Sequence, residues 1–183
     1  MKVSIRTART ADAQAVNEVY QHYIDHSVTT FNEINKTVTA RAQEISELLR
    51  MYPFLIAEDE EGAFLGFACA EPVRSQTGYR FAAELTIYLH PDTPSGSGVG
   101  SQLYERLLSL LKQQGFVYAV GVVHVQNEAS MRLHRRFGFT EAARLPRCAY
   151  KHGQWLDAAI LVRQLLPLSD PPADPIPFPR LGL

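Results

Sequence analysis

A glycine-rich loop between an apolar segment and an amphipathic segment constrains the fold more than any other feature. Gly96, Gly98 and Gly100 follow the alternating segment 85–89, and the apolar residues of segment 99–114 recur at helical spacing. A strand, a loop and a helix in this order present free backbone N–H groups where the helix dipole favours negative charge. Because glycine has no side chain, a pyrophosphate can approach the backbone. The loop predicts an anion site, although glycines at ordinary turn positions give the same local pattern.

Two other phosphate-binding loops do not match these residues. A P-loop ends in Gly-Lys-Ser or Gly-Lys-Thr, whereas Gly100 is followed by Ser101 and Gln102. A dinucleotide-binding loop needs a glycine three residues after Gly98, where Ser101 stands. It also needs an acidic residue about 20 positions later, and segment 117–125 has none. The sequence therefore excludes both of these nucleotide-binding classes.

The hydrophobic pattern predicts an α/β fold with a mixed central sheet and helices on both faces. Strands are predicted at 3–6, 54–58, 63–71, 80–89, 116–125, 140–145 and 156–165, and helices at 10–25, 40–52, 99–114 and 128–137. Segment 116–125 is almost entirely apolar, which predicts a central strand buried on both faces. Six of the 11 prolines follow residue 166, so residues 1–166 are predicted as the domain and 167–183 as an extended Pro-rich tail.

Composition narrows the classes of partner. The 18 basic and 19 acidic side chains nearly cancel, which gives no reason to expect nucleic acid or an anionic membrane. The apolar runs are shorter than a membrane span, and the first residues do not form a secretory signal. Cys69 and Cys148 lack metal-binding or redox spacing. These features predict a cytoplasmic protein without a metal.

Two further blocks give the glycine loop a family context. They are Asn127-x-x-Ser130-x-x-Leu133-His134-x-x-Phe137-Gly138-Phe139 and Tyr150-Lys151-His152-Gly153-Gln154-Trp155-Leu156-Asp157. With the loop, they resemble in order and spacing the GCN5-related N-acetyltransferase superfamily, and within it the phosphinothricin (amino-acid) N-acetyltransferase group. The resemblance extends from Val3 to Pro167. It implies a splayed sheet, acetyl-CoA as cosubstrate, direct transfer to a small-molecule amine without a metal, and a homodimer.

The resemblance also implies the coenzyme contacts. The pantetheine arm would lie along Ile87, Tyr88 and Leu89, the pyrophosphate at Ser95, Gly96, Ser97, Gly98, Val99 and Gly100, and a further contact at Asn127. A backbone N–H near Tyr88 or Leu89 would polarise the thioester carbonyl. The family loop usually begins with Gln or Arg, often followed by a basic residue, where this chain has Ser95 and Gly96. Coenzyme affinity is expected to fall unless another basic group compensates.

Two residues are candidates for proton transfer. Strand alternation places Glu84, Thr86 and Tyr88 on one face, opposite Leu85 and its apolar neighbours. By itself this fits a solvent-facing glutamate equally well. The spacing Tyr79-x-x-x-x-Glu84-x-x-x-Tyr88 resembles the family segment whose glutamate is the proposed base. The resemblance likewise implies that His134 protonates the departing thiolate, although a structural histidine in a short basic helix gives the same pattern.

The acceptor side is predicted from charge and resemblance. Arg74, Tyr79 and Arg80 precede Glu84, and arginine suits the recognition of a carboxylate or phosphinate. Phe31 and Glu33 stand in a segment that resembles the group's acceptor loop. Each arginine could equally be a solvated surface charge. Acetylation of a polyamine or a protein N-terminus, and a non-catalytic coenzyme-binding module, stay open as alternatives.

Overall fold

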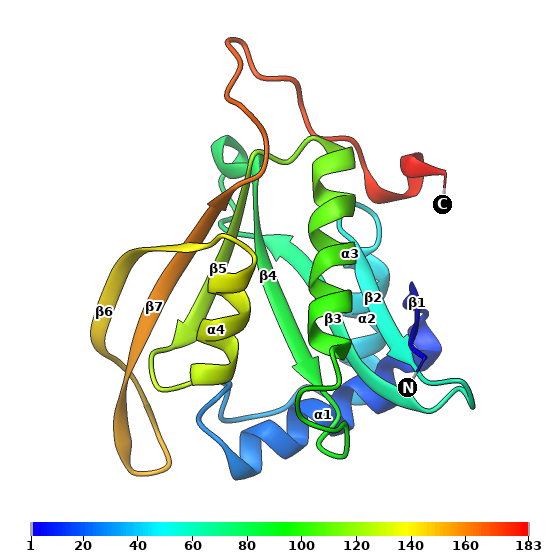
Figure 1. Cartoon of the computed structure of the whole chain (residues 1–183), viewed down its shortest axis with the longest axis vertical. Helices are drawn as coiled ribbons and strands as arrows, with labels where there is room; N and C mark the ends of the chain where they lie inside the picture. Colours follow the sequence, from blue (N-terminus) through cyan, green and yellow to red (C-terminus); the bar gives the residue numbers. More distant parts are fainter. Residues whose placement is uncertain (1, 183) are drawn as a thin grey trace.

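The computed structural model describes residues 2–182 as a mixed α/β fold around one seven-stranded sheet (Figure 1). The strand order is β1-β2-β3-β4-β5-β7-β6. The strands are β1 (Ser4–Thr7), β2 (Phe54–Glu58), β3 (Phe64–Pro72), β4 (Ala82–Leu89), β5 (Tyr118–His124), β6 (Thr140–Lys151) and β7 (Gln154–Gln164). The pairing of β4 with β5 is parallel, and the other neighbouring pairs in the described chain are antiparallel. The predicted mixed sheet is confirmed.

Helices cover both faces of this sheet, as predicted (Figure 1). They are α1 (Ala13–His26), α2 (Val38–Leu48), α3 (Val99–Gln114) and α4 (Glu128–Arg136). The buried leucines of α3 join one core cluster with Leu55 and Ala68, whereas α1 and α2 join a second cluster with Ile56 and Phe67. Neighbouring residues of β2 and β3 thus face opposite cores. These two strands, rather than β5, are buried on both faces.

The strands β4 and β5 separate, as the family resemblance implies for a splayed sheet, and this changes the burial predicted for β5. The two strands pair only where Ala82–Glu84 lie beside Tyr118–Val120. Beyond these residues no pairing joins them, and Val122 is 39% exposed. The prediction that segment 116–125 is buried on both faces is therefore wrong at Val122. The apolar run of β5 instead supplies one wall of an opening in the sheet.

The C-terminal segment also departs from a purely extended tail. Ile176 donates its backbone N–H to the carbonyl of Gln114 at 2.8 Å, and Phe178 is buried against the core that contains α3. Residues Phe178–Leu181 form a short 3-10 turn with a proline at its start, a position that proline tolerates. Three element boundaries also differ from their predictions. Strand β6 extends to Lys151, and helix α2 starts at Val38. Helix α1 follows a 3-10 turn over Thr10–Asp12. No helix within residues 2–182 is long and apolar enough to cross a membrane.

Candidate active site

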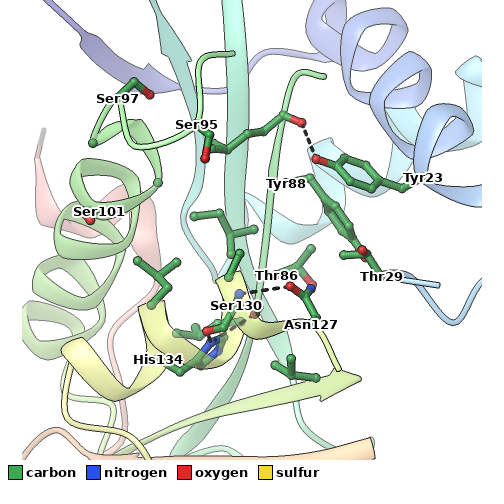
Figure 2. Close-up of a pocket in the computed structure, with 18 of the residues that line it drawn as sticks. Tyr23, Thr29, Thr86, Tyr88, Ser95, Ser97, Ser101, Asn127, Ser130 and His134 are labelled. Carbon is green, nitrogen blue, oxygen red and sulfur yellow. Dashed lines mark hydrogen bonds between the residues drawn. The ribbon is translucent and has the colours of Figure 1, made fainter. Parts of the chain in front are cut away.

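A cavity of about 480 Å³ opens where β4 and β5 separate (Figure 2). Its walls come from the end of β4, the glycine loop, the first turn of α3, the middle of β5 and one side of α4. The residues predicted to contact the coenzyme that line it are Ile87, Tyr88, Leu89, Ser95, Gly96, Ser97, Gly98, Gly100 and Asn127. Val99 does not line the cavity, and the whole residue is buried.

The glycine loop forms an open cradle at the start of α3. Gly96 and Gly98 adopt φ values of 76° and 84°, a left-handed conformation that other residues enter at a cost. A side chain at Gly96 would meet no protein atom within 4 Å, so the space beside it is free for a ligand. Gly98 is the N-cap of α3 and provides no side chain to accept hydrogen bonds from the first turn. The backbone donors and the helix dipole fit the pyrophosphate of a coenzyme.

The exposed edge of β4 supplies a second row of backbone groups. His90 donates its N–H to Leu65 on the β3 side, at 2.8 Å. Because backbone groups alternate along a strand, the N–H groups of Ile87 and Leu89 face the opening instead. The carbonyl of Leu89 points the same way, since it accepts a hydrogen bond of 3.1 Å from the Tyr23 hydroxyl (Figure 2). The two strands thus leave donors and acceptors that can pair with the amides of a pantetheine arm.

Glu84 lies at the closed end of this opening, where β4 still pairs with Val120 of β5. It is half-buried and does not belong to the cavity lining. On β3, Glu71 lies directly opposite Glu84 in the antiparallel register. Burial raises the pKa of the Glu84 carboxyl, the charge of Glu71 raises it further, and Arg74 opposes the shift. Burial also raises the pKa of Glu71, so the two facing carboxyls hold protons more tightly than exposed ones.

His134 lies on α4 at the other wall of the cavity and is 2% exposed. Its Nδ1 lies 2.8 Å from the carbonyl of Ser130, which can only accept a hydrogen bond, so Nδ1 carries the proton. The neutral ring then has a bare Nε2, which is buried without a hydrogen-bond partner against Gly121. Burial lowers the pKa of the imidazole. In this neutral form Nε2 carries no proton, so it would have to be protonated before it could act as an acid.

The residues predicted for the acceptor do not line the cavity, and the structure separates them. Arg80 donates to Asp174 at 2.6 Å and stacks over the ring of Phe81, while Tyr79 is 53% exposed in the same turn. The ring of Phe31 meets His124 of β5 edge to face at 6.5 Å between centroids. Arg74 alone of the two arginines acts electrostatically on Glu84.

The β6–β7 hairpin fastens the loop that carries Phe31 and Glu33. The buried ammonium of Lys151 donates to the carbonyls of Tyr23 at 3.2 Å and of Thr30 at 3.0 Å. Burial lowers the pKa of this ammonium, and the charge of Glu33 raises it. The Lys-x-Gly-x-Trp-x-Asp block singled out in the sequence thus fixes the loop between α1 and α2 next to the site.

Sequence reasoning missed several residues that the fold brings to the site. Tyr23 and Thr29 line the cavity, although the spacing of Tyr23 in α1 indicates only a core position. Glu71 could not be paired with Glu84 before the strand register was known. Asn127, by contrast, is a residue predicted from the sequence, and it caps α4, since its side chain accepts from the N–H of Ser130 at 3.1 Å (Figure 2). Within residues 2–182 no three acidic, histidine or cysteine side chains gather as metal ligands.

Comparison with known proteins points to one family. The sequence profile of the Acetyltransferase (GNAT) domain matches residues 5–160. Phosphinothricin N-acetyltransferase of Streptomyces viridochromogenes is 35% identical over 95% of this chain and 94% of its own. The L-methionine sulfoximine/L-methionine sulfone acetyltransferase of Salmonella typhimurium is 35% identical over 89% and 95% of the two chains. The crystal structure of a phosphinothricin acetyltransferase from Sinorhizobium meliloti with acetyl-CoA superposes with a TM-score of 0.88, at 32% identity over 96% and 94%.

Proposed function

The chain belongs to the GNAT acetyltransferase family, and on this premise we propose that it acetylates the amino group of a small amino-acid-like acceptor. It is an acetyl-CoA-dependent N-acetyltransferase, with acetyl-CoA as cosubstrate. The acceptor would be of the phosphinothricin, methionine sulfoximine or methionine sulfone type, which the names of its relatives supply. The observation that carries the proposal is the opening between β4 and β5, which extends from the glycine cradle to Leu85 and Thr86, next to Glu84.

Acetyl-CoA supplies an activated acetyl thioester when it is bound. The N–H groups at the start of α3 would hold the pyrophosphate, and the exposed edge of β4 would pair with the pantetheine arm. The N–H of Leu89 faces the opening, which favours it over that of Tyr88 as the donor that polarises the thioester carbonyl. Asn127 would add a contact from the start of α4.

Glu84 would remove a proton from the acceptor ammonium, directly or through a water. Its raised pKa supports this role, because a general base works best when its pKa lies near the pH at which the enzyme operates. The position at the closed end of the opening leaves space on the Tyr88 side for the acceptor. The neighbouring charge of Glu71 would also attract an ammonium to this end of the cavity.

His134 would protonate the departing thiolate through Nε2, which is buried against Gly121, so the ring would have to turn towards the cavity for the transfer. This role requires the imidazolium form, and the lowered pKa makes that form less abundant as pH rises. His134→Asn should therefore lower turnover most at acidic pH, with a smaller loss towards alkaline pH. A loss that is equal across the pH profile would assign His134 to packing rather than to proton transfer.

The acceptor's anionic group would bind on the side of Arg74. Phe31 meets His124, four residues further along β5 than the Val120 that pairs with Glu84, so Phe31 and Glu33 would contact the acceptor from the other side. Arg74 supports this placement through its electrostatic effect on Glu84, and the planar guanidinium suits a carboxylate or phosphinate. Tyr79 and Arg80 would contribute from the neighbouring turn once Arg80 leaves Asp174. This would place an anionic group and an amine at separate points, as an amino acid requires.

The protein would act in the cytoplasm as a homodimer. Support for a dimer comes from the β6–β7 hairpin at the sheet edge, where Leu145, Tyr150 and Trp155 are 43%, 52% and 61% exposed. Tyr150 and Trp155 contact each other at 5.3 Å between ring centroids, and exposed aromatic side chains are enriched in protein–protein interfaces. Light scattering should give twice the mass of the chain, and Trp155→Glu should shift it towards the monomer. A monomeric wild-type protein would refute the dimer without affecting the activity.

An amine panel tests the acceptor most directly. Release of coenzyme A thiol from acetyl-CoA should be stimulated by phosphinothricin, methionine sulfoximine or methionine sulfone, and mass spectrometry should detect the acetylated amine. Stimulation by a polyamine or by a peptide N-terminus alone would replace this acceptor class. Coenzyme binding without thiol release for any amine would leave the chain as a coenzyme-binding module.

A further inference from the structure

The proposed coenzyme cradle lacks the basic side chain that is common in the family loop it resembles. Residues 95–98 contribute hydroxyls and backbone but no charge, and the first turn of α3 adds only Val99, Gly100 and Ser101. The proposed ligand carries several negative charges on its phosphates. Backbone N–H groups and a helix dipole offset part of that charge, but charge-assisted hydrogen bonds are the stronger contacts. A guanidinium close to the start of α3 would therefore change the affinity of the site.

Arg136, at the C-terminal end of α4, lies near the start of α3, where the glycine loop lacks a basic side chain. Its Nη1 is 3.4 Å from the hydroxyl of Ser101, which lines the cavity in the first turn of α3. Leu133, three residues earlier, also lines the cavity, so Arg136 lies on the side of α4 that faces it. The chain brings the two helices together because α3 and α4 cover the same face of the sheet (Figure 1).

The charge of Arg136 is not used elsewhere within residues 2–182. Arg132 donates to Glu128 at 3.0 Å, one turn earlier on the same helix, and Arg144 donates to Glu141. Arg135 acts electrostatically on Glu141, away from the cavity. Arg136, by contrast, has only the neutral hydroxyl of Ser101 as a side-chain partner, and it is exposed beside this lining residue of the cavity. Its remaining N–H donors are free for an anion.

We propose that Arg136 binds a phosphate group of the coenzyme and replaces, from α4, the basic side chain missing from the glycine loop. The inference rests on the proposed coenzyme site and adds a specificity residue to it. A guanidinium can donate two parallel hydrogen bonds to phosphate oxygens, which a hydroxyl or a backbone amide cannot do. The chemistry fits either the pyrophosphate or the 3′-phosphate of coenzyme A.

Calorimetry without acceptor tests this inference independently of turnover. Arg136→Ala should weaken coenzyme A binding by about tenfold, the lower end for a charge-assisted hydrogen bond because the side chain is exposed. Arg135→Ala, the neighbouring exposed arginine, is the matched control and should bind within about twofold of the wild type. Thermal melting of both variants verifies that the fold is intact.

Three ligands separate the possible phosphates. Wild type and Arg136→Ala should bind pantetheine equally, because it has no phosphate. A loss that persists with 3′-dephospho-coenzyme A identifies the pyrophosphate, and a loss that disappears identifies the 3′-phosphate. Wild-type affinity of Arg136→Ala for coenzyme A, an equal loss in Arg135→Ala, or an equal loss with pantetheine would overturn the inference. Failure of the wild type to bind coenzyme A would instead refute the proposed function.

Discussion

The two ends of the opening between β4 and β5 differ in the groups that they offer to a ligand. At the proposed coenzyme end, most of the available groups belong to the backbone of the glycine cradle, the first turn of α3 and the free edge of β4. At the proposed acceptor end the candidate groups are side chains from separate segments, with Glu84 and Glu71 on adjacent strands and Phe31 on the loop that Lys151 holds. Backbone groups are the same for every residue type, so a site made from them suits a ligand that does not vary. A site made from side chains can change its ligand by substitution of single residues. Variants should therefore separate coenzyme binding from acceptor chemistry.

The largest effect is expected at the acceptor end, from Glu84→Gln. Removal of a general base typically costs about 100- to 10,000-fold in rate, so turnover at pH 7 should fall by this order. The loss should shrink as pH rises, because more of the acceptor amine is then free without help. Coenzyme affinity measured by calorimetry should not change. Near-native turnover at pH 7 would remove Glu84 from the mechanism.

The opposite pattern is expected at the coenzyme end, from Gly98→Val. Its φ of 84° and the cradle beside it leave no place for a branched side chain next to a pyrophosphate. Coenzyme affinity should fall by about 10- to 100-fold, the range expected from lost charge-assisted hydrogen bonds. Gly62→Val is the matched control, because Gly62 has a φ of 83° in a remote turn with no atom near its missing side chain. Equal losses of affinity in both variants would attribute the effect to backbone strain.

Acceptor recognition should respond to Arg74 more than to Arg80. Arg74→Ala should raise the Michaelis constant for the amino acid by about 10- to 150-fold and leave that for acetyl-CoA nearly unchanged. Arg80→Ala should have a smaller effect, because this guanidinium is held by Asp174. Steady-state kinetics with each substrate varied in turn provides the measurement. Unchanged acceptor constants in both variants and in the double variant would place the anionic group elsewhere.

The smallest effect is expected from Glu71→Gln, and it should be a shift along the pH axis. The Glu71 charge raises the pKa of Glu84, so its removal should lower that pKa. A base with a lower pKa loses its proton at lower pH, and the acidic limb of kcat/KM should move in that direction. The surrounding charges are Arg74 near Glu84, and Glu44, Lys36 and Arg41 near Glu71. An unmoved limb would mean that Glu71 does not act on the base.

The same contrast explains how much could be predicted from the sequence. Helix α3 has the predicted bounds, because Gly98 and Gly115 mark its ends in the left-handed conformation. Strand β2 also has its predicted bounds, since Pro53 precedes it. The glycine loop is local in sequence, so its left-handed turns and the helix start could be predicted from its glycines, whereas its assignment to a coenzyme also needed the two further blocks and the family resemblance. Local signals of this kind do not depend on strand register or on helix packing.

The acceptor end and Arg136 depend on contacts between distant segments. Glu71 meets Glu84 only through the register of β3 and β4, and Tyr23 meets the carbonyl of Leu89 across 66 residues of sequence. Arg136 lies beside Ser101 because two helices pack on one face. The divergence of β4 from β5 likewise could not be derived from the apolar run of β5, which is typical of an ordinary buried strand.

A crystal structure with coenzyme A and a methionine sulfone acceptor would test the account most directly. The account predicts the pyrophosphate at the first turn of α3, the pantetheine arm along the free edge of β4, and the acceptor amine nearest to Glu84. An acceptor amine on the Ser95 side of the cavity, or one separated from Glu84 by more than a single bridging water, would contradict it.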